Sequence, residues 1–184
     1  MSNHEVANLI NSYLSLTRKM IDIQQNRAQT IEKVAIAWES QFGPVSGDLQ
    51  RILGYIIPEL FDNIEQHSKA SAVEIFHLKD DKFLTFLVID NGITISKSLK
   101  AGIAEAVKGK SSKKDQGRGF GLPSILSLVC NLGGRLIIIS GNDIFTYNES
   151  EDCLNCNNFQ GTIVGINFPL TLKCNSKLFY KLIG

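Results

Sequence analysis

The segment ELFDNIEQHS, residues 59–68, ends a stretch in which apolar residues recur at intervals of three and four. This spacing is typical of a helix with one buried face, and the residues that form it are Ile52, Leu53, Ile56, Ile57, Leu60, Phe61 and Ile64. Ser46 and Asp48 are suited to cap the start of such a helix. Pro58 lies inside the pattern, which predicts either a kink or a first helical turn at that position.

Glu59 and Asn63 are four residues apart on this helix and therefore share one of its faces. An asparagine offers a neutral oxygen ligand, and magnesium is usually held by few protein groups together with phosphates and water. A carboxylate one turn earlier is suited to orient or deprotonate an attacking water or hydroxyl. Two solvated polar residues show the same spacing, so the pair by itself leaves both interpretations open.

The rest of the chain alternates between strand-like and helix-like patterns. Residues 5–40 show helical periodicity and precede a break at residues 41–44. Further along, strands are expected at residues 72–78, 83–89, 135–140, 144–147 and 162–168, and a helix at residues 121–131. We therefore expect an α/β (α+β) two-layer sandwich with helices on one face of a mixed, mostly antiparallel sheet, plus a helical N-terminal extension.

Two glycine-containing turns follow secondary-structure elements in this pattern. Asp90-Asn91-Gly92 comes directly after a strand, where an acid followed by glycine is a common turn. Alternatively, Asp90 accepts a hydrogen bond from the exocyclic amine of a base and Gly92 lets the backbone come close. The second turn, GRGFGL at residues 117–122, opens a helix, and closely spaced glycines there let backbone amides approach a polyphosphate.

Basic residues gather before or within the second turn: Lys110, Lys113, Lys114 and Arg118. A solvated basic loop explains them as well as a phosphate site does. Gly109-Lys110-Ser111 lacks the earlier glycine of a P-loop, because residue 104 is alanine.

The order of these elements resembles the GHKL superfamily of gyrase, heat-shock chaperone, histidine kinase and mismatch-repair ATPases and anti-sigma-factor serine kinases. The resemblance rests on E-x-x-x-N on a helix, D-x-G after a strand, a basic stretch, G-x-G-x-G-L and a Gly-Thr strand. It covers residues 46–170 and implies the Bergerat (histidine kinase-like ATPase) fold with ATP and Mg2+ as ligands. Residues 1–45 are then an extension for dimerisation or docking, and residues 171–184 a C-terminal tail.

The resemblance also implies roles for individual residues. Asn63 corresponds to the magnesium ligand, Glu59 to the general base and His67 to the histidine that closes this helix. Gln66 stands where histidine kinases often carry a phosphate-contacting lysine. Asp90, with Gly92, corresponds to the acid that reads adenine.

The remaining implied contacts come from the second half of the chain. Gly161-Thr162 resembles the last-strand pair whose threonine hydroxyl supports the adenine, and residues 96–116, including Lys114, resemble a mobile ATP lid. The phosphate side would be formed by the glycine box and its neighbours: Gly117, Arg118, Gly119, Phe120, Gly121 and Leu122.

Two features of the sequence depart from the family pattern. Thr94 stands where the first glycine box, D-x-G-x-G, usually has its second glycine, and a β-branched side chain there is expected to narrow the pocket or stiffen the hinge of the lid. The lid also lacks the paired phenylalanines of histidine kinases. We therefore expect an ATP-dependent kinase or ATPase of the anti-sigma, partner-switching type. A nucleotide-gated binding module with little turnover and a detached histidine-kinase catalytic domain remain open as alternatives.

Composition narrows the partners and the compartment. The 184 residues carry a formal net charge of +1, which gives no general attraction for nucleic acid or anionic membrane. Apolar runs are strand-sized, far too short for a membrane span, and four cysteines in a chain of this length form no disulfide framework. Cys153 and Cys156 have zinc-like spacing, but further ligands would have to converge from scattered places. We expect a cytoplasmic protein that has a protein partner and that can form a homodimer.

Overall fold

The computed structural model describes residues 5–14, 21–22, 45–109, 121–148 and 158–184. In this part of the chain, six strands form one sheet in the order β1-β2-β3-β6-β4-β5, and every neighbouring pair is antiparallel. The strands are β1 (Ile21–Asp22), β2 (Ala72–Lys79), β3 (Phe83–Asp90), β4 (Arg135–Gly141), β5 (Asp143–Tyr147) and β6 (Phe159–Pro169). The predicted α/β sandwich with an antiparallel sheet is confirmed.

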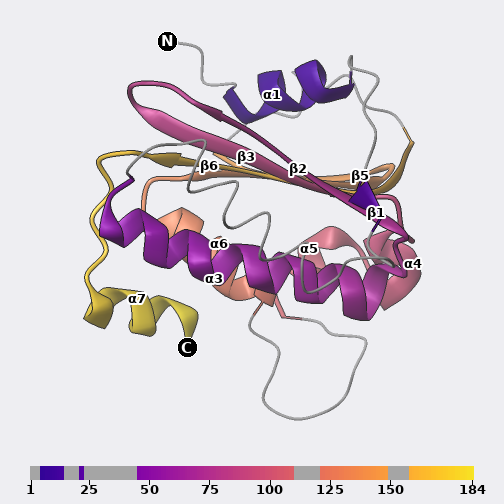
Figure 1. Ribbon diagram of the computed structural model, residues 1–184. Coiled ribbons are helices and arrows are strands. Elements are labelled where there is room, and N and C mark those ends of the chain that lie inside the picture. Colours follow the sequence, from indigo (N-terminus) through magenta and orange to yellow (C-terminus); the bar gives the residue numbers. More distant parts are fainter. Residues whose placement is uncertain (1–4, 15–20, 23–44, 110–120, 149–157) are drawn as a thin grey trace.

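Helices cover both faces of this sheet (Figure 1). On one face lie α3 (Gly47–Asn63), α4 (Ile95–Leu99), α5 (Ile103–Ala106) and α6 (Gly121–Asn131), with α7 (Ser176–Ile183) beneath them. Helix α1 (Glu5–Leu14) packs on the opposite face. The main helical layer therefore lies on one side, as predicted, and α1 adds a third layer on the other side.

Helix α3 begins where the sequence predicted, because the Ser46 Oγ accepts a hydrogen bond from the Leu49 N–H at 3.2 Å. It runs through Pro58 to Asn63, so no new helix begins at the proline. Pro58 and Gly54, the residue whose carbonyl loses its helical donor, both lie on the exposed side of the helix, where water can bind that carbonyl.

A single π-helical turn, Ile64–Ser68, follows α3 and ends at Lys69 in the left-handed conformation (φ 53°). Turns of this kind inside or at the end of α-helices are uncommon and often lie at functional sites. The apolar pattern predicted a helix over these residues and did not distinguish the two helix types.

Two apolar clusters hold the layers together, one on each face of the sheet. The larger cluster lies between the sheet and α3 and α6, and includes Ile56, Phe86 and Ile138. In the smaller cluster, Val6 and Ile10 of α1 pack over the other face. Gly165 makes this approach possible, since a Cβ there would lie 2.6 Å from Val6 Cγ1.

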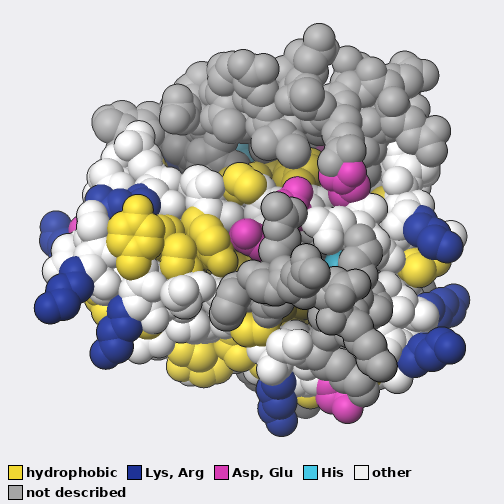
Figure 2. Space-filling model, turned by 90° about the horizontal axis from the view of Figure 1, so that it is seen from below, with side chains coloured by type: hydrophobic (Ala, Val, Ile, Leu, Met, Phe, Trp, Pro, Cys, Tyr) yellow, Lys and Arg dark blue, Asp and Glu magenta, His cyan; other side chains and the backbone are white. Residues whose placement is uncertain are grey.

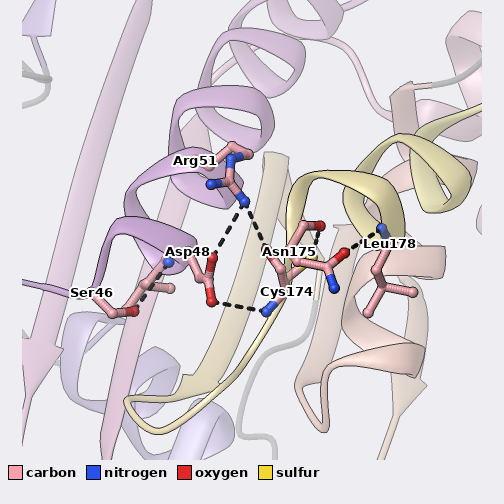
Figure 3. A network of polar contacts seen from close by, with 7 residues as sticks. Ser46, Asp48, Arg51, Cys174, Asn175 and Leu178 are labelled. Atoms are coloured by element: carbon pink, nitrogen blue, oxygen red, sulfur yellow. Dashed lines mark hydrogen bonds and ion pairs between the residues drawn. The ribbon is translucent and has the colours of Figure 1, made fainter.

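Hydrogen bonds join the start of α7 to the start of α3 (Figure 3). Arg51 of α3 donates to the Cys174 carbonyl at 2.7 Å, and the Cys174 N–H donates to Asp48 Oδ2 at 3.1 Å. Asn175 then caps α7 by accepting from the Leu178 N–H at 2.9 Å. These bonds fix the start of α7 to the start of α3.

The stretch predicted as a mobile lid is also partly helical. Residues 95–109 contain α4 and α5, and Ile103, Ala106 and Val107 are buried in the main core or at its edge. Residues 110–116 of the predicted lid, and the helix expected around residues 31–38, lie outside the described residues. Among the described helices, none has the length and apolar character needed to cross a bilayer.

Candidate functional site

A cavity of about 530 Å³ lies between the sheet and the helical layer. Its floor is a square of side chains from two paired strands, Val88 and Asp90 of β3 and Thr162 and Val164 of β6. These residues alternate along their strands, so their side chains point to the same face of the sheet. The floor thus combines an apolar half with a polar half.

Asp90 is the charged group of this floor and is only 3% exposed. Its Oδ1 accepts a hydrogen bond from the Gly92 N–H at 2.8 Å. Burial raises the pKa of the Asp90 carboxyl to about 6, against the opposite effect of hydrogen bonds from Gly92 and Ser68. Such a buried carboxylate is a strong acceptor for a ligand donor, because few other groups compensate its charge.

Thr162 stands directly opposite Asp90 in the β3–β6 ladder. Its hydroxyl lies 2.9 Å from the hydroxyl of Ser140 on β4, which also accepts from the Ile95 N–H at 2.8 Å. Ser140 is fully buried and links β4, β6 and the start of α4 beside Thr162. The sequence motifs do not include Ser140, because its partners are distant in sequence.

Glu59 and Asn63 of α3 both line the opposite part of the cavity, as their spacing predicted. Gly121, the first residue of α6, lies against them: a Cβ there would be 3.1 Å from Asn63 Nδ2 and 3.2 Å from Glu59 Oε2. Gly121 is distant in sequence from Glu59 and Asn63, so the fold brings the predicted E-x-x-x-N motif and the end of the glycine box together. A larger residue at 121 would fill the space in front of both side chains.

Asn63 also has an unmet bonding requirement. Its Nδ2 is buried and has no hydrogen-bond partner among the described residues. A buried amide without partners costs free energy unless a ligand supplies them. The amide carries a donor for a phosphate oxygen and a neutral oxygen for a cation, so the donor set fits the predicted Mg2+ and phosphate ligands.

Other predicted site residues divide into three groups. Gln66, His67 and Leu122 line the cavity with those already described. Lys114, Gly117, Arg118, Gly119 and Phe120 lie outside the described residues. Gly92 is not in the cavity wall: a Cβ there would clash with the Ser68 carbonyl oxygen and lie 2.7 Å from Ser68 Oγ. The close approach of the Ser68 backbone is therefore sufficient to require glycine at this position.

Thr94 likewise has a different position from the one expected. It does not line the cavity, and its Cγ2 faces Gly141 of β4, where an added Cβ would be 3.0 Å away. Its Oγ1 caps α4 by accepting from the Lys97 N–H at 3.4 Å. The threonine thus stiffens the start of the predicted lid without narrowing the cavity.

Further walls of the cavity come from inside and outside the predicted motifs. Ser98, Leu99 and Ala106 belong to the predicted lid. Tyr55 of α3, Ile95 of α4 and Ile183 of α7 were not among the predicted residues. No metal-binding group of three or more His, Cys, Asp or Glu side chains occurs among the described residues, and Cys153 and Cys156 fall outside them.

A protein family and a solved structure resemble this chain, whereas a search of curated proteins finds no match. The solved structure is a mycobacterial sensor histidine kinase, MprB, with 18% identity and a TM-score of 0.47 over 83% of this chain and 97% of that chain. The family model described as histidine kinase-, DNA gyrase B- and HSP90-like ATPase matches residues 48–172. Since this match spans more than half of the chain, the protein belongs to that ATPase family.

Proposed function

We propose that this chain binds Mg-ATP in the cavity, with the adenine at Asp90 and Thr162 and the triphosphate at Asn63 and Gly121. The observation that carries the proposal is that one cavity holds both a buried carboxylate and a buried amide nitrogen without a hydrogen-bond partner among the described residues. A carboxylate with 3% exposure lies on the floor, and a buried amide nitrogen without a described partner lies on α3. Membership of the ATPase family supports nucleotide as the common ligand.

The adenine end is suited to a flat ring with a donor at its edge. Val88 and Val164 give the floor an apolar surface on which a base can lie. The Asp90 carboxylate would accept a hydrogen bond from the exocyclic amine, and the Thr162 hydroxyl is next to it on the neighbouring strand. In a base that has a carbonyl in place of that amine, the carbonyl oxygen would face the carboxylate oxygen. Both are hydrogen-bond acceptors, so such a base should bind less tightly.

At the other end, Asn63 would hold Mg2+ through its amide oxygen, and Mg2+ supplies charge neutralisation for the phosphates. Glu59 would accept the proton of the attacking hydroxyl as a new P–O bond forms and the bond to the bridging oxygen of the leaving ADP breaks. Gly121 keeps the space in front of both side chains open. The described residues thus provide a base, a metal ligand and room for a phosphate.

We further propose that turnover serves signalling, with the phosphoryl group transferred to a serine or threonine of a protein partner. Incubation of the chain with labelled ATP and candidate partners tests this directly. Acid-stable label on a partner that disappears with Glu59→Gln supports the kinase. Acid-labile label would instead identify a detached histidine-kinase catalytic domain. ATP-dependent partner binding without any transfer would identify a nucleotide-gated binding module.

A cytoplasmic location and a homodimer are further parts of this proposal. The near-neutral net charge supports a protein partner rather than nucleic acid or membrane. Light scattering with and without Mg-ATP measures the oligomeric state, and a mass equal to one chain under both conditions would reject the homodimer.

A further inference from the structure

Tyr55 lies one helical turn before Glu59 on α3, and both side chains line the cavity. Residues at this spacing are neighbours on a helix surface. The charge of Glu59 contributes to raising the pKa of Tyr55, after the larger effect of burial and against a hydrogen bond with Ser124. Tyr55 is therefore a neutral phenol at neutral pH, placed next to the proposed general base.

Two contacts connect Tyr55 to the C-terminal helix α7. Its ring meets the ring of Phe179 edge-on, with centroids 5.9 Å apart and an interplanar angle of 86°. Its hydrogen-bond partner Ser124, which is 4% exposed, donates to the Ile183 carbonyl at 3.2 Å. Ser124 therefore links the Tyr55 hydroxyl to the end of α7.

Helix α7 is an addition to the part of the chain that matches the ATPase family, which ends at residue 172. It is held at its start by the Asp48, Arg51 and Cys174 bonds (Figure 3), and at its end Ile183 lines the cavity. The helical side of the molecule carries grouped apolar side chains bordered by lysine and arginine side chains (Figure 2). Phe179 does not belong to this exposed apolar group, because its side chain is only 5% exposed.

We propose that Tyr55 is a positioning residue that couples the docking of α7 to the orientation of Glu59. Phe179 and Ser124 fix the Tyr55 ring, and the fixed ring restricts Glu59 to conformations that face Gly121 and Asn63. This inference rests on the proposed function, because it assigns Tyr55 a part in the same reaction.

The test compares wild type with Tyr55→Phe, Phe179→Leu, the double variant and Lys181→Ala, a change on the exposed side of α7. Calorimetry measures the Kd for Mg-ATP, and steady-state hydrolysis measures kcat as a function of pH. We expect Tyr55→Phe and Phe179→Leu to lower kcat about tenfold with Kd within about twofold of wild type.

If Tyr55 and Phe179 act through one connection, the activity of the double variant can also be predicted. The double variant should lose no more activity than either single variant, since both changes break one connection, and Lys181→Ala should behave as wild type. Thermal unfolding checks that each variant is folded, and Tyr55→Phe keeps the test valid where Phe179→Leu unfolds the chain.

Several results overturn the proposal. Unchanged kcat in Tyr55→Phe, a rise in Kd that accounts for the whole loss, or additive losses in the double variant each exclude the coupling. If wild type binds Mg-ATP but does not hydrolyse it, this inference fails while the proposed nucleotide site stands. If wild type binds no Mg-ATP, both fail together.

Discussion

Asp90 and Thr162 are register partners across β3 and β6, and both side chains face the cavity between the sheet and α3. Asp90 is the last residue of β3, and Thr162 lies four positions into β6. Gly161 precedes the threonine with φ 114°, and a Cβ there would clash with the Asp90 carbonyl oxygen. The glycine therefore lets the two strands come close enough to place a carboxylate beside a hydroxyl.

Replacing Asp90 by asparagine should stabilise the protein above about pH 6. Because burial raises the pKa of the carboxyl from 3.8 to about 6, the folded state holds a proton that the unfolded state has already released. The stability from this group is complete below pH 3.8 and is lost as the pH rises to about 6. The amide that replaces the carboxylate carries no charge. At about pH 8, the free energy of unfolding of Asp90→Asn should therefore be about 2 kcal/mol higher than that of wild type.

Urea unfolding at several pH values measures this difference. Asp81→Asn, in the exposed turn between β2 and β3, is the matched control and should not change stability at any pH. An Asp90→Asn variant that is less stable than wild type above pH 6 would show that the carboxylate forms favourable bonds that outweigh its burial.

Gly121→Ala should weaken Mg-ATP binding without harming the fold. The new methyl group would lie 3.1 Å from Asn63 Nδ2 and 3.2 Å from Glu59 Oε2, in the space that we propose for a phosphate. We expect about a tenfold higher Kd. Gly54→Ala is the control, because a Cβ at this exposed position of α3 meets nothing within 4 Å, and alanine should raise helix stability by about 0.5–1 kcal/mol. Equal Kd values for the two variants would place the phosphates elsewhere.

Thr94→Gly restores the family glycine and tests the finding that the threonine faces away from the cavity. The change removes the methyl group packed on Gly141 and the hydroxyl that caps α4. We expect the free energy of unfolding to fall by about 1 kcal/mol and the Kd for Mg-ATP to stay within about twofold. A large gain in affinity would mean that the side chain obstructs the nucleotide after all.

Gly165→Ala should separate α1 from the sheet. The methyl group would meet Val6 Cγ1 at 2.6 Å and Leu87 Cδ2 at 3.0 Å, and overpacking of this kind costs about 1–3 kcal/mol. Hydrogen exchange should then increase in α1. Adding Val6→Ala to the same chain makes room for the methyl group and should recover part of the loss, whereas a further loss would contradict the packing of α1 on this face.

Much of the fold followed from the sequence because its periodicities are unambiguous. The apolar run that predicted a strand at residues 83–89 and the capping pattern that predicted a helix after Ser46 both appear in the structure, as β3 and α3. Helices α4 and α5 were missed because they are short, and residues 96–116 are rich in polar and basic side chains. Tertiary burial of Ile103 and Val107 decides their conformation, and no local pattern reports it.

The candidate site was predictable where a motif carries the residue itself. Glu59, Asn63, Asp90 and Thr162 line one cavity although they come from three elements. Supporting residues such as Ser140, Ser68 and Tyr55 were not predictable, since their partners are distant in sequence and appear only when the strands are paired. The sequence pattern led us to relate Gly92 and Thr94 to the nucleotide, whereas the structure shows that Gly92 packs on Ser68 and Thr94 on Gly141.

The most direct test of the account is calorimetric titration of wild type and Asp90→Asn with ATP and with inosine triphosphate, both with Mg2+. Inosine presents a carbonyl where adenine has its exocyclic amine, so wild type should bind ATP at least about tenfold more tightly. In Asp90→Asn, ATP binding should weaken, and the preference should fall to about twofold or less, because the amide can donate as well as accept. Equal binding of both nucleotides by wild type, or a preference that survives the substitution, would contradict the assignment of Asp90 as the residue that recognises the base.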